Sequence, residues 1–155
     1  MDRFSIRYAF CAGRDTFGNP DGMDTYIHSV TATTQVTKRV KHVFDWTLFN
    51  QHNRADEGHH FVSYALMNEV IYQFNKNWAF GTRFGMLNQN ADMSPADVET
   101  DWYTVSLGAN WTPNKWLTVK PEVRYDWMKG EEATPFNNGN NTYQFSGGMS
   151  AIVKF

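Results

Sequence analysis

Hydrophobic and polar residues alternate one by one along much of the chain, most clearly between residues 117 and 127. Apolar side chains occupy every second position there, namely Leu117, Val119, Pro121, Val123, Tyr125 and Trp127. Between them stand the polar residues Thr118, Lys120, Glu122, Arg124 and Asp126. Successive side chains of a β-strand point to opposite faces, so a period of two predicts a strand with one apolar and one charged face.

The same alternation recurs along the chain and predicts eight strands with no convincing helix. The predicted strands span about 3–12, 26–37, 41–50, 60–74, 78–86, 103–111, 117–127 and 143–155. We therefore expect an all-β fold with antiparallel up-and-down connections.

The predicted connections alternate between long and short. Long polar segments span 13–25, 50–60, 88–100 and 129–141, whereas short turns fall near 37–39, 75–77 and 112–115. In an antiparallel meander, this alternation puts all long loops at one end of the sheet and all short turns at the other. Outer-membrane barrels have this asymmetry, with the long loops outside the cell.

Aromatic residues gather near the predicted strand ends. Trp78, Trp111 and Trp116 lie toward the short turns, and Trp127 lies toward the long loops. Two such girdles are typical of a transmembrane β-barrel, whose apolar face meets lipid and whose polar face meets a wet lumen. A soluble ligand-binding barrel of lipocalin type would instead point the aromatic-rich face inward. The girdles favour the transmembrane β-barrel.

Length and composition set bounds on the class of protein. With 155 residues, the chain is one domain, 1–155, or part of one. Its net charge is −2 with scattered positive residues, which argues against nucleic acid as a partner. No apolar run approaches the ~18 residues of a transmembrane helix. A single Cys11 excludes an internal disulfide. The N-terminus has no secretory signal, so we expect a removed signal or an earlier chain segment.

Motifs for catalysis or cofactor binding are absent from the sequence. We find no Ser-His-Asp arrangement, no phosphate-binding glycine loop and no dinucleotide fingerprint, so we expect neither an enzyme nor a cofactor. His59 and His60 lie beside Asp56 and Glu57, but no spacing presets a metal geometry, and we expect a solvated loop rather than a metal site.

The charged face of residues 117–127 is the candidate functional feature. Lys120, Glu122, Arg124 and Asp126 alternate in sign, and Arg83 is a candidate cross-strand participant. Facing a lumen, these side chains would bias which ions pass. The basic neighbours of Glu122 and Asp126 favour a charge ladder over an acid/base pair. Pro121 interrupts the strand, because it has no N–H, and we expect a bulge or a missing hydrogen bond there.

Four segments of the chain resemble the bacterial proteins described as putative β-barrel porins, OmpL-like. These segments are TYIHSVTATTQVTKRVKHVFDW, NWAFGTRFGM, WTPNKWLTVKPEVRYDW and the ending SAIVKF. The ending, with Phe155 after Val153 and Ala151, is similar to the signal by which the barrel-assembly machinery recognises such proteins. The resemblance covers nearly all of this chain, but this chain corresponds to only about the C-terminal half of a family member. The resemblance therefore implies that the complete protein has a signal peptide and earlier strands.

The resemblance implies a porin-like channel in the outer membrane of a Gram-negative bacterium, passing small hydrophilic solutes or ions by passive diffusion. Outer-membrane lipid and the barrel-assembly machinery are the expected partners. The sequence leaves open whether the protein forms a homo-oligomer. The alternative is a small barrel without conductance that acts as an anchor or adhesion scaffold through its long loops, since eight strands enclose an interior that side chains can fill.

Overall fold

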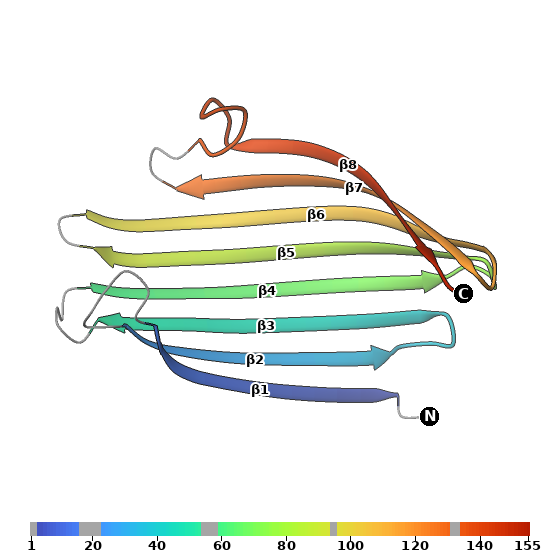
Figure 1. Cartoon of the computed structure of the whole chain (residues 1–155), viewed down its shortest axis with the longest axis horizontal. Helices are drawn as coiled ribbons and strands as arrows, with labels where there is room; N and C mark the ends of the chain where they lie inside the picture. The colour runs from blue at the N-terminus through green and yellow to red at the C-terminus, as the bar shows by residue number, and fades with distance from the viewer. Residues whose placement is uncertain (1–2, 16–22, 54–58, 94–95, 131–133) are drawn as a thin grey trace.

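Eight antiparallel strands form one sheet, in the order in which they occur in the chain (Figure 1). The computed structural model describes residues 3–15, 23–53, 59–93, 96–130 and 134–155. The strands are β1 (Phe4–Asp15), β2 (Met23–Gln35), β3 (Val40–Asn53), β4 (His59–Gln73), β5 (Trp78–Met93), β6 (Ala96–Asn114), β7 (Leu117–Gly130) and β8 (Tyr143–Val153). Across these described ranges, no helix is long and apolar enough to cross a membrane. The predicted all-β, up-and-down fold is confirmed.

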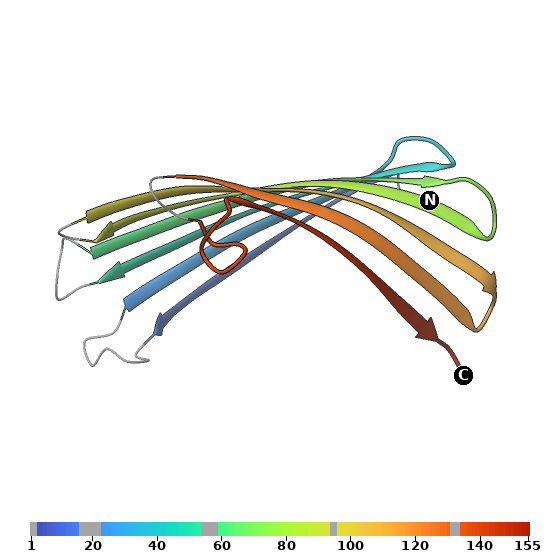
Figure 2. The ribbon, with the colours of Figure 1, turned by 90° about the horizontal axis from the view of Figure 1, so that it is seen from above.

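The sheet is curved and open (Figure 2). Each strand is hydrogen-bonded to its neighbours in sequence, which leaves β1 and β8 as the two edges. The side chains of β8 are exposed along its whole length, and so are those of Phe4–Arg14 in β1. The structure thus has the strand order of an up-and-down barrel without the closing pair.

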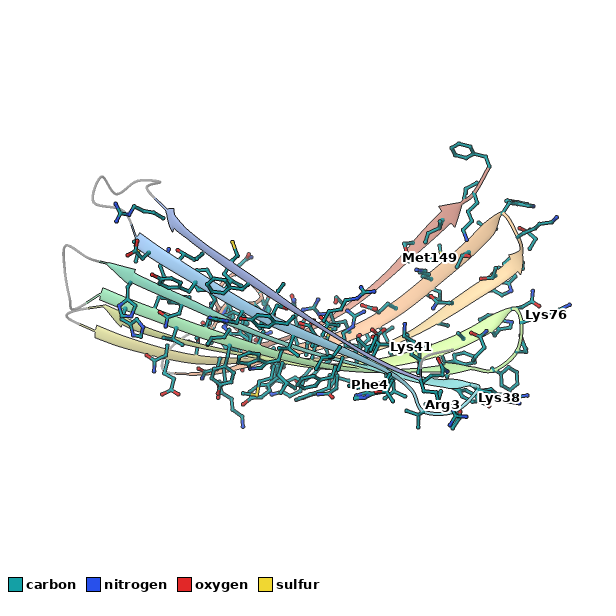
Figure 3. The ribbon with its side chains drawn as sticks, turned by 90° about the horizontal axis from the view of Figure 1, so that it is seen from below. Arg3, Phe4, Lys38, Lys41, Lys76 and Met149 are labelled. Atoms are coloured by element: carbon teal, nitrogen blue, oxygen red, sulfur yellow. The ribbon has the colours of Figure 1, made fainter. Side chains whose placement is uncertain are left out.

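A continuous register separates two faces across all eight strands. The inner face carries the row Ser5, Thr33, Val43, Glu69, Arg83, Ser106, Arg124 and Ser146. The outer face carries the neighbouring row Ile6, Ala32, Phe44, Asn68, Phe84, Val105, Tyr125 and Phe145. Figure 3 shows side chains on both sides of the curve, with Lys41 of the inner face on the concave side.

The three short turns share one construction. The side-chain oxygens of Thr37, Asn75 and Asn114 each accept hydrogen bonds from two backbone N–H groups, two and three residues further on, at 2.8–3.2 Å. Asn and Thr favour turns because their side chains satisfy the backbone locally in this way. Lys38 and Lys76 belong to two of these turns, and Figure 3 shows both residues at the same end of the sheet.

The prediction of a long loop at 88–100 is wrong. Strand β5 continues to Met93 and β6 begins at Ala96, so only residues 94 and 95 lie between them. These strand ends could not be predicted from hydrophobic alternation, because both faces of the strands are polar there. Backbone pairing does not depend on that alternation and continues to the strand ends. The other long connections shorten to 16–22, 54–58 and 131–142, of which only 134–142 is described.

Pro121 interrupts the ladder between β6 and β7, as its missing N–H predicts. The paired residues Gly108 and Glu122 are followed by Trp111 and Val119, and no partner in β6 stands opposite Pro121. A register irregularity follows between Trp111 and Asn114. On its other side Pro121 keeps its place opposite Met149 of β8. The disruption therefore stays on one side of the strand.

Adjacent residues of β8 provide a test of the two faces. Met149 is on the outer face and 75% exposed, and Ser150 is on the inner face opposite Lys120. In a membrane, Met149→Arg should cost about 2–4 kcal/mol of folding free energy, because the charge faces hydrocarbon. Ser150→Arg should cost about 0.5 kcal/mol or less, because its charge stays in water. Urea titrations of both variants in lipid vesicles measure the difference, and equal losses would contradict the assignment of the faces.

Candidate functional site

Two rows of stacked aromatic rings bound an apolar band on the outer face. Near the short turns, Trp78 stacks on Trp111 with ring centroids 5.8 Å apart. Toward the other end, Trp127 stacks on Tyr103 at 5.3 Å and on Tyr125 at 5.6 Å. Along β5, nine residues run from Trp78 to Met86, the partner of Tyr103. A tilted transmembrane strand requires ~9–11 residues, so the band has the height of a membrane's apolar core.

A polar collar begins directly beyond the second aromatic row. Asp101 accepts hydrogen bonds from Asn88 Nδ2 at 2.8 Å and from the Tyr103 hydroxyl at 3.2 Å. The ammonium of Lys129 lies 5.8 Å from the centre of the Tyr103 ring. Tyr and Trp with an apolar body and a hydrogen-bonded tip are favoured where a membrane meets water. The collar is therefore a second, independent indication that a membrane–water interface would lie at this level of the strands.

The outer face also carries one polar pair within the apolar band. His42 Nε2 lies 3.2 Å from Asn68 Oδ1, on neighbouring strands. Polar groups that face hydrocarbon are costly unless they pair, and these two satisfy one another. His28, which is also on the outer face, lies with its Nδ1 2.7 Å from the Tyr8 hydroxyl.

Charged side chains on the inner face of β7 extend from Lys120, near the short turn, past the middle of the strand to Asp126. Arg124 Nε donates to Asp126 Oδ1 at 2.6 Å, and Gln144 Nε2 donates to Asp126 Oδ2 at 3.2 Å. Asp126 is only 5% exposed, whereas half of the Arg124 side chain stays open to solvent. This half of the predicted ladder thus pairs along one strand, as alternating signs on one face allow.

The remaining predicted residues lie on the same face but pair differently. Arg83 Nη2 is 3.9 Å from Glu69 Oε1 of the neighbouring strand β4. Glu69 is a partner that sequence reasoning missed, and only the register of β4 and β5 brings it opposite Arg83. Lys120 and Glu122 take part in no ion pair within the described part of the chain. Their charges are therefore available to groups that approach the inner face.

A hollow of about 570 Å³ lies on the inner face over β4–β8. Gly81, Gly108 and Gly148 line it together with Arg83 and Glu122. A Cβ at Gly148 would meet no heavy atom within 4 Å, and one at Gly81 would meet none closer than 3.8 Å. Absent side chains rather than a strained backbone therefore create this space.

A second hollow of about 280 Å³ continues toward the short turns and shares Asn110 and Lys120 with the first. Lys76 and Lys154 also line it. Together the two hollows form a polar groove that runs along the inner face to the short-turn end.

Beyond Asp126, toward the other end, the inner face of β5–β7 is partly apolar, which the sequence did not predict. Leu87, Trp102 and Met128 stand in one cross-strand row, and Phe49 and Phe61 contact one another edge-on at 5.7 Å nearby. Phe136, from the connection between β7 and β8, packs edge-on against Trp102 at 6.0 Å. We define Leu87, Trp102, Met128 and Phe136 as the mouth cluster. Extending the predicted strand back by one residue from Tyr103 would have placed Trp102 on the opposite, inner face.

The other predicted residues are placed as follows. Trp116 is exposed beside the last short turn. Ala151 and Val153 lie on the outer face of β8 opposite Val119 and Leu117, and Phe155 is fully exposed. Their role as an assembly signal stays a prediction. Asp56 and Glu57 lie outside the described residues, while His60 stacks on His52 with ring centroids 4.1 Å apart.

Comparison with known proteins gives one family. The family model described as "Putative beta-barrel porin-2, OmpL-like" matches residues 1–155, the whole chain. No curated protein matches the sequence significantly.

The inner face supplies a matched pair of carboxylates for a stability test. Asp126→Asn should lower the free energy of unfolding by about 1–2 kcal/mol, because it removes a charge-assisted hydrogen bond from a nearly buried oxygen. Glu122→Gln should change it little, because Glu122 has no ion pair among the described residues. Urea unfolding in detergent micelles measures both. A larger loss for Glu122→Gln would contradict this account of the ladder.

Proposed function

Because the chain belongs to the family of OmpL-like β-barrel porins, we propose that its inner face lines an outer-membrane channel for passive diffusion of small hydrophilic solutes or ions. The observation that carries the proposal is the separation of the two faces. The outer face presents an apolar band between aromatic rows, and the inner face presents a groove lined by charged residues and glycines. Lipid outside and water inside is the arrangement that satisfies both faces.

The charged groove gives the channel a mechanism. Small solutes stay hydrated by the water in the groove and by its polar lining, so crossing requires no transfer into hydrocarbon. Arg83, Lys120 and Glu122 lie within reach of a passing ion and set the local field. Because Arg124 and Asp126 neutralise one another at 2.6 Å, the unpaired Lys120 and Glu122 contribute most to ion preference.

A lumen also requires that both sheet edges be paired. Unpaired backbone groups cannot face hydrocarbon, because lipid offers no hydrogen-bonding partners. In an up-and-down sheet of eight strands, β1 and β8 run in opposite directions. They can therefore pair antiparallel with one another or with further strands, and the second option gives the wider lumen.

The second candidate function is a non-conducting barrel that acts as an anchor or scaffold. The mouth cluster favours it, because apolar side chains on the inner face could fill the interior of a barrel closed by β1 and β8. The two functions differ in a direct observable. A channel gives discrete single-channel currents in a planar bilayer, whereas a filled barrel gives none.

Two adjacent glycines of β8 make the sharpest test of the channel. Gly148→Phe would put a ring into the 570 Å³ hollow and should lower single-channel conductance by roughly a quarter. Gly147→Phe puts the same ring on the outer face, where a Cβ meets only ordinary contacts at 3.9 and 4.0 Å, and should leave conductance unchanged. Absence of current in the unsubstituted protein, or equal effects of both variants, would overturn the channel proposal.

The unpaired lysine of the groove should control ion preference. Lys120→Gln removes a positive charge from the lining without exposing a buried partner, so the ratio of cation to anion permeability should rise roughly twofold. Lys38→Gln, at an exposed short turn, is the matched control and should leave the ratio unchanged. Reversal potentials across a salt gradient give the ratio, and a shift toward anions would contradict the assignment.

A further inference from the structure

We propose that the segment 134–142 is folded onto the inner face as the constriction that limits the size of permeating solutes. The segment is held there by Phe136 on Trp102. This inference rests on the proposed channel and adds to it the element that selects solutes by size. It begins from the mouth cluster, which places apolar side chains on the inner face beyond the charged groove.

The segment is ordered by its own hydrogen bonds. Phe136 and Asn141 exchange two backbone hydrogen bonds at 3.1 Å, and the Thr134 hydroxyl donates to the carbonyl of Gly139 at 2.6 Å. Asn137, Asn138 and Gly139 all have positive φ, at 52°, 55° and 83°. Asn and Gly tolerate this left-handed conformation best, so the sequence is suited to this tight turn. The segment therefore presents a compact knob rather than an extended loop.

The knob has two sides of opposite character. The ring of Phe136 is half-buried and lies edge-on to Trp102, 6.0 Å between centroids. The Trp102 indole donates to Gln89 Oε1 at 3.0 Å, which fixes its orientation on the wall. Met128, in the same row, is only 4% exposed. By contrast, residues 137–140 are exposed. A segment that packs on the inner face and also borders water needs an apolar side chain toward the sheet and polar groups toward the water. Phe136 and the exposed asparagines meet these two needs.

Docking of the segment explains the apolar wall. A contiguous apolar patch beside water is unfavourable unless something covers it, and small apolar clusters commonly lie beneath long loops. Trp102 belongs to the inner face by register, so a ring that packs on it must lie on the concave side of the sheet. Figure 2 shows the connection between β7 and β8 on that side. A compact segment on the concave side narrows the passage at this end.

Release of the anchor tests the constriction. In liposome-swelling assays, Phe136→Ala should raise the permeation rate of a tetrasaccharide relative to that of a monosaccharide by at least about twofold, because pore diameter sets the size limit. Trp102→Ala should act in the same direction. Phe145→Ala, at the outer face of β8 and 71% exposed, is the matched control and should leave the ratio unchanged. Heat-modifiable gel migration checks that each variant folds.

A cysteine probe supplies the second measurement. With Cys11→Ser as background, Asn138→Cys should react with a bulky charged thiol reagent and lose part of its single-channel current. His52→Cys, on the outer face at the same end, should keep its current. Unchanged size selectivity in Phe136→Ala, or an unchanged current after modification of residue 138, would overturn the constriction while leaving a conducting channel. Absence of current in the unsubstituted protein would instead overturn the channel itself.

Discussion

Backbone pairing in a single register is the constraint on which the whole structure depends. A shift of one residue in any ladder would move every side chain of that strand to the opposite face. Seven ladders keep Glu69, Arg83 and Arg124 on one side and Phe84 and Tyr125 on the other. The separation of an apolar band from a charged groove is therefore a property of the sheet as a whole. No single strand produces it.

The two faces meet different physical demands along their length. On the outer face, aromatic rings bound the apolar band, and Asp101 and Lys129 lie directly beyond the second aromatic row. On the inner face of β7, charges extend from Lys120 to Asp126, and the Trp102 ring lies beyond them, against Phe136 of the segment 134–142. In the channel that we propose, the charged zone would set the local field and the apolar zone would set the width.

Departures from regular pairing are few and local. Pro121 loses its partner in β6 but keeps its place opposite Met149, and the irregularity between Trp111 and Asn114 lies close by. Gly108 stands beside this interruption, where an added Cβ would lie 3.4 Å from the Pro121 carbonyl oxygen. The absence of a side chain at Gly108 leaves room both for the displaced backbone and for the hollow above it. Gly108 thus accommodates the irregular backbone at Pro121 and also contributes to the groove.

The sequence by itself determined the strands, their up-and-down order, the two faces and the aromatic rows, because a period of two and the position of Trp or Tyr near strand ends are local signals. It also anticipated the interruption at Pro121, since a missing N–H needs no context. Tertiary structure alone decided which side chains meet. Arg83 pairs with Glu69 because β4 and β5 are in one register, and Trp102 receives Phe136 because the segment after β7 folds back. Such pairs join residues far apart in the chain, and alternation along one strand carries no information about the strand beside it.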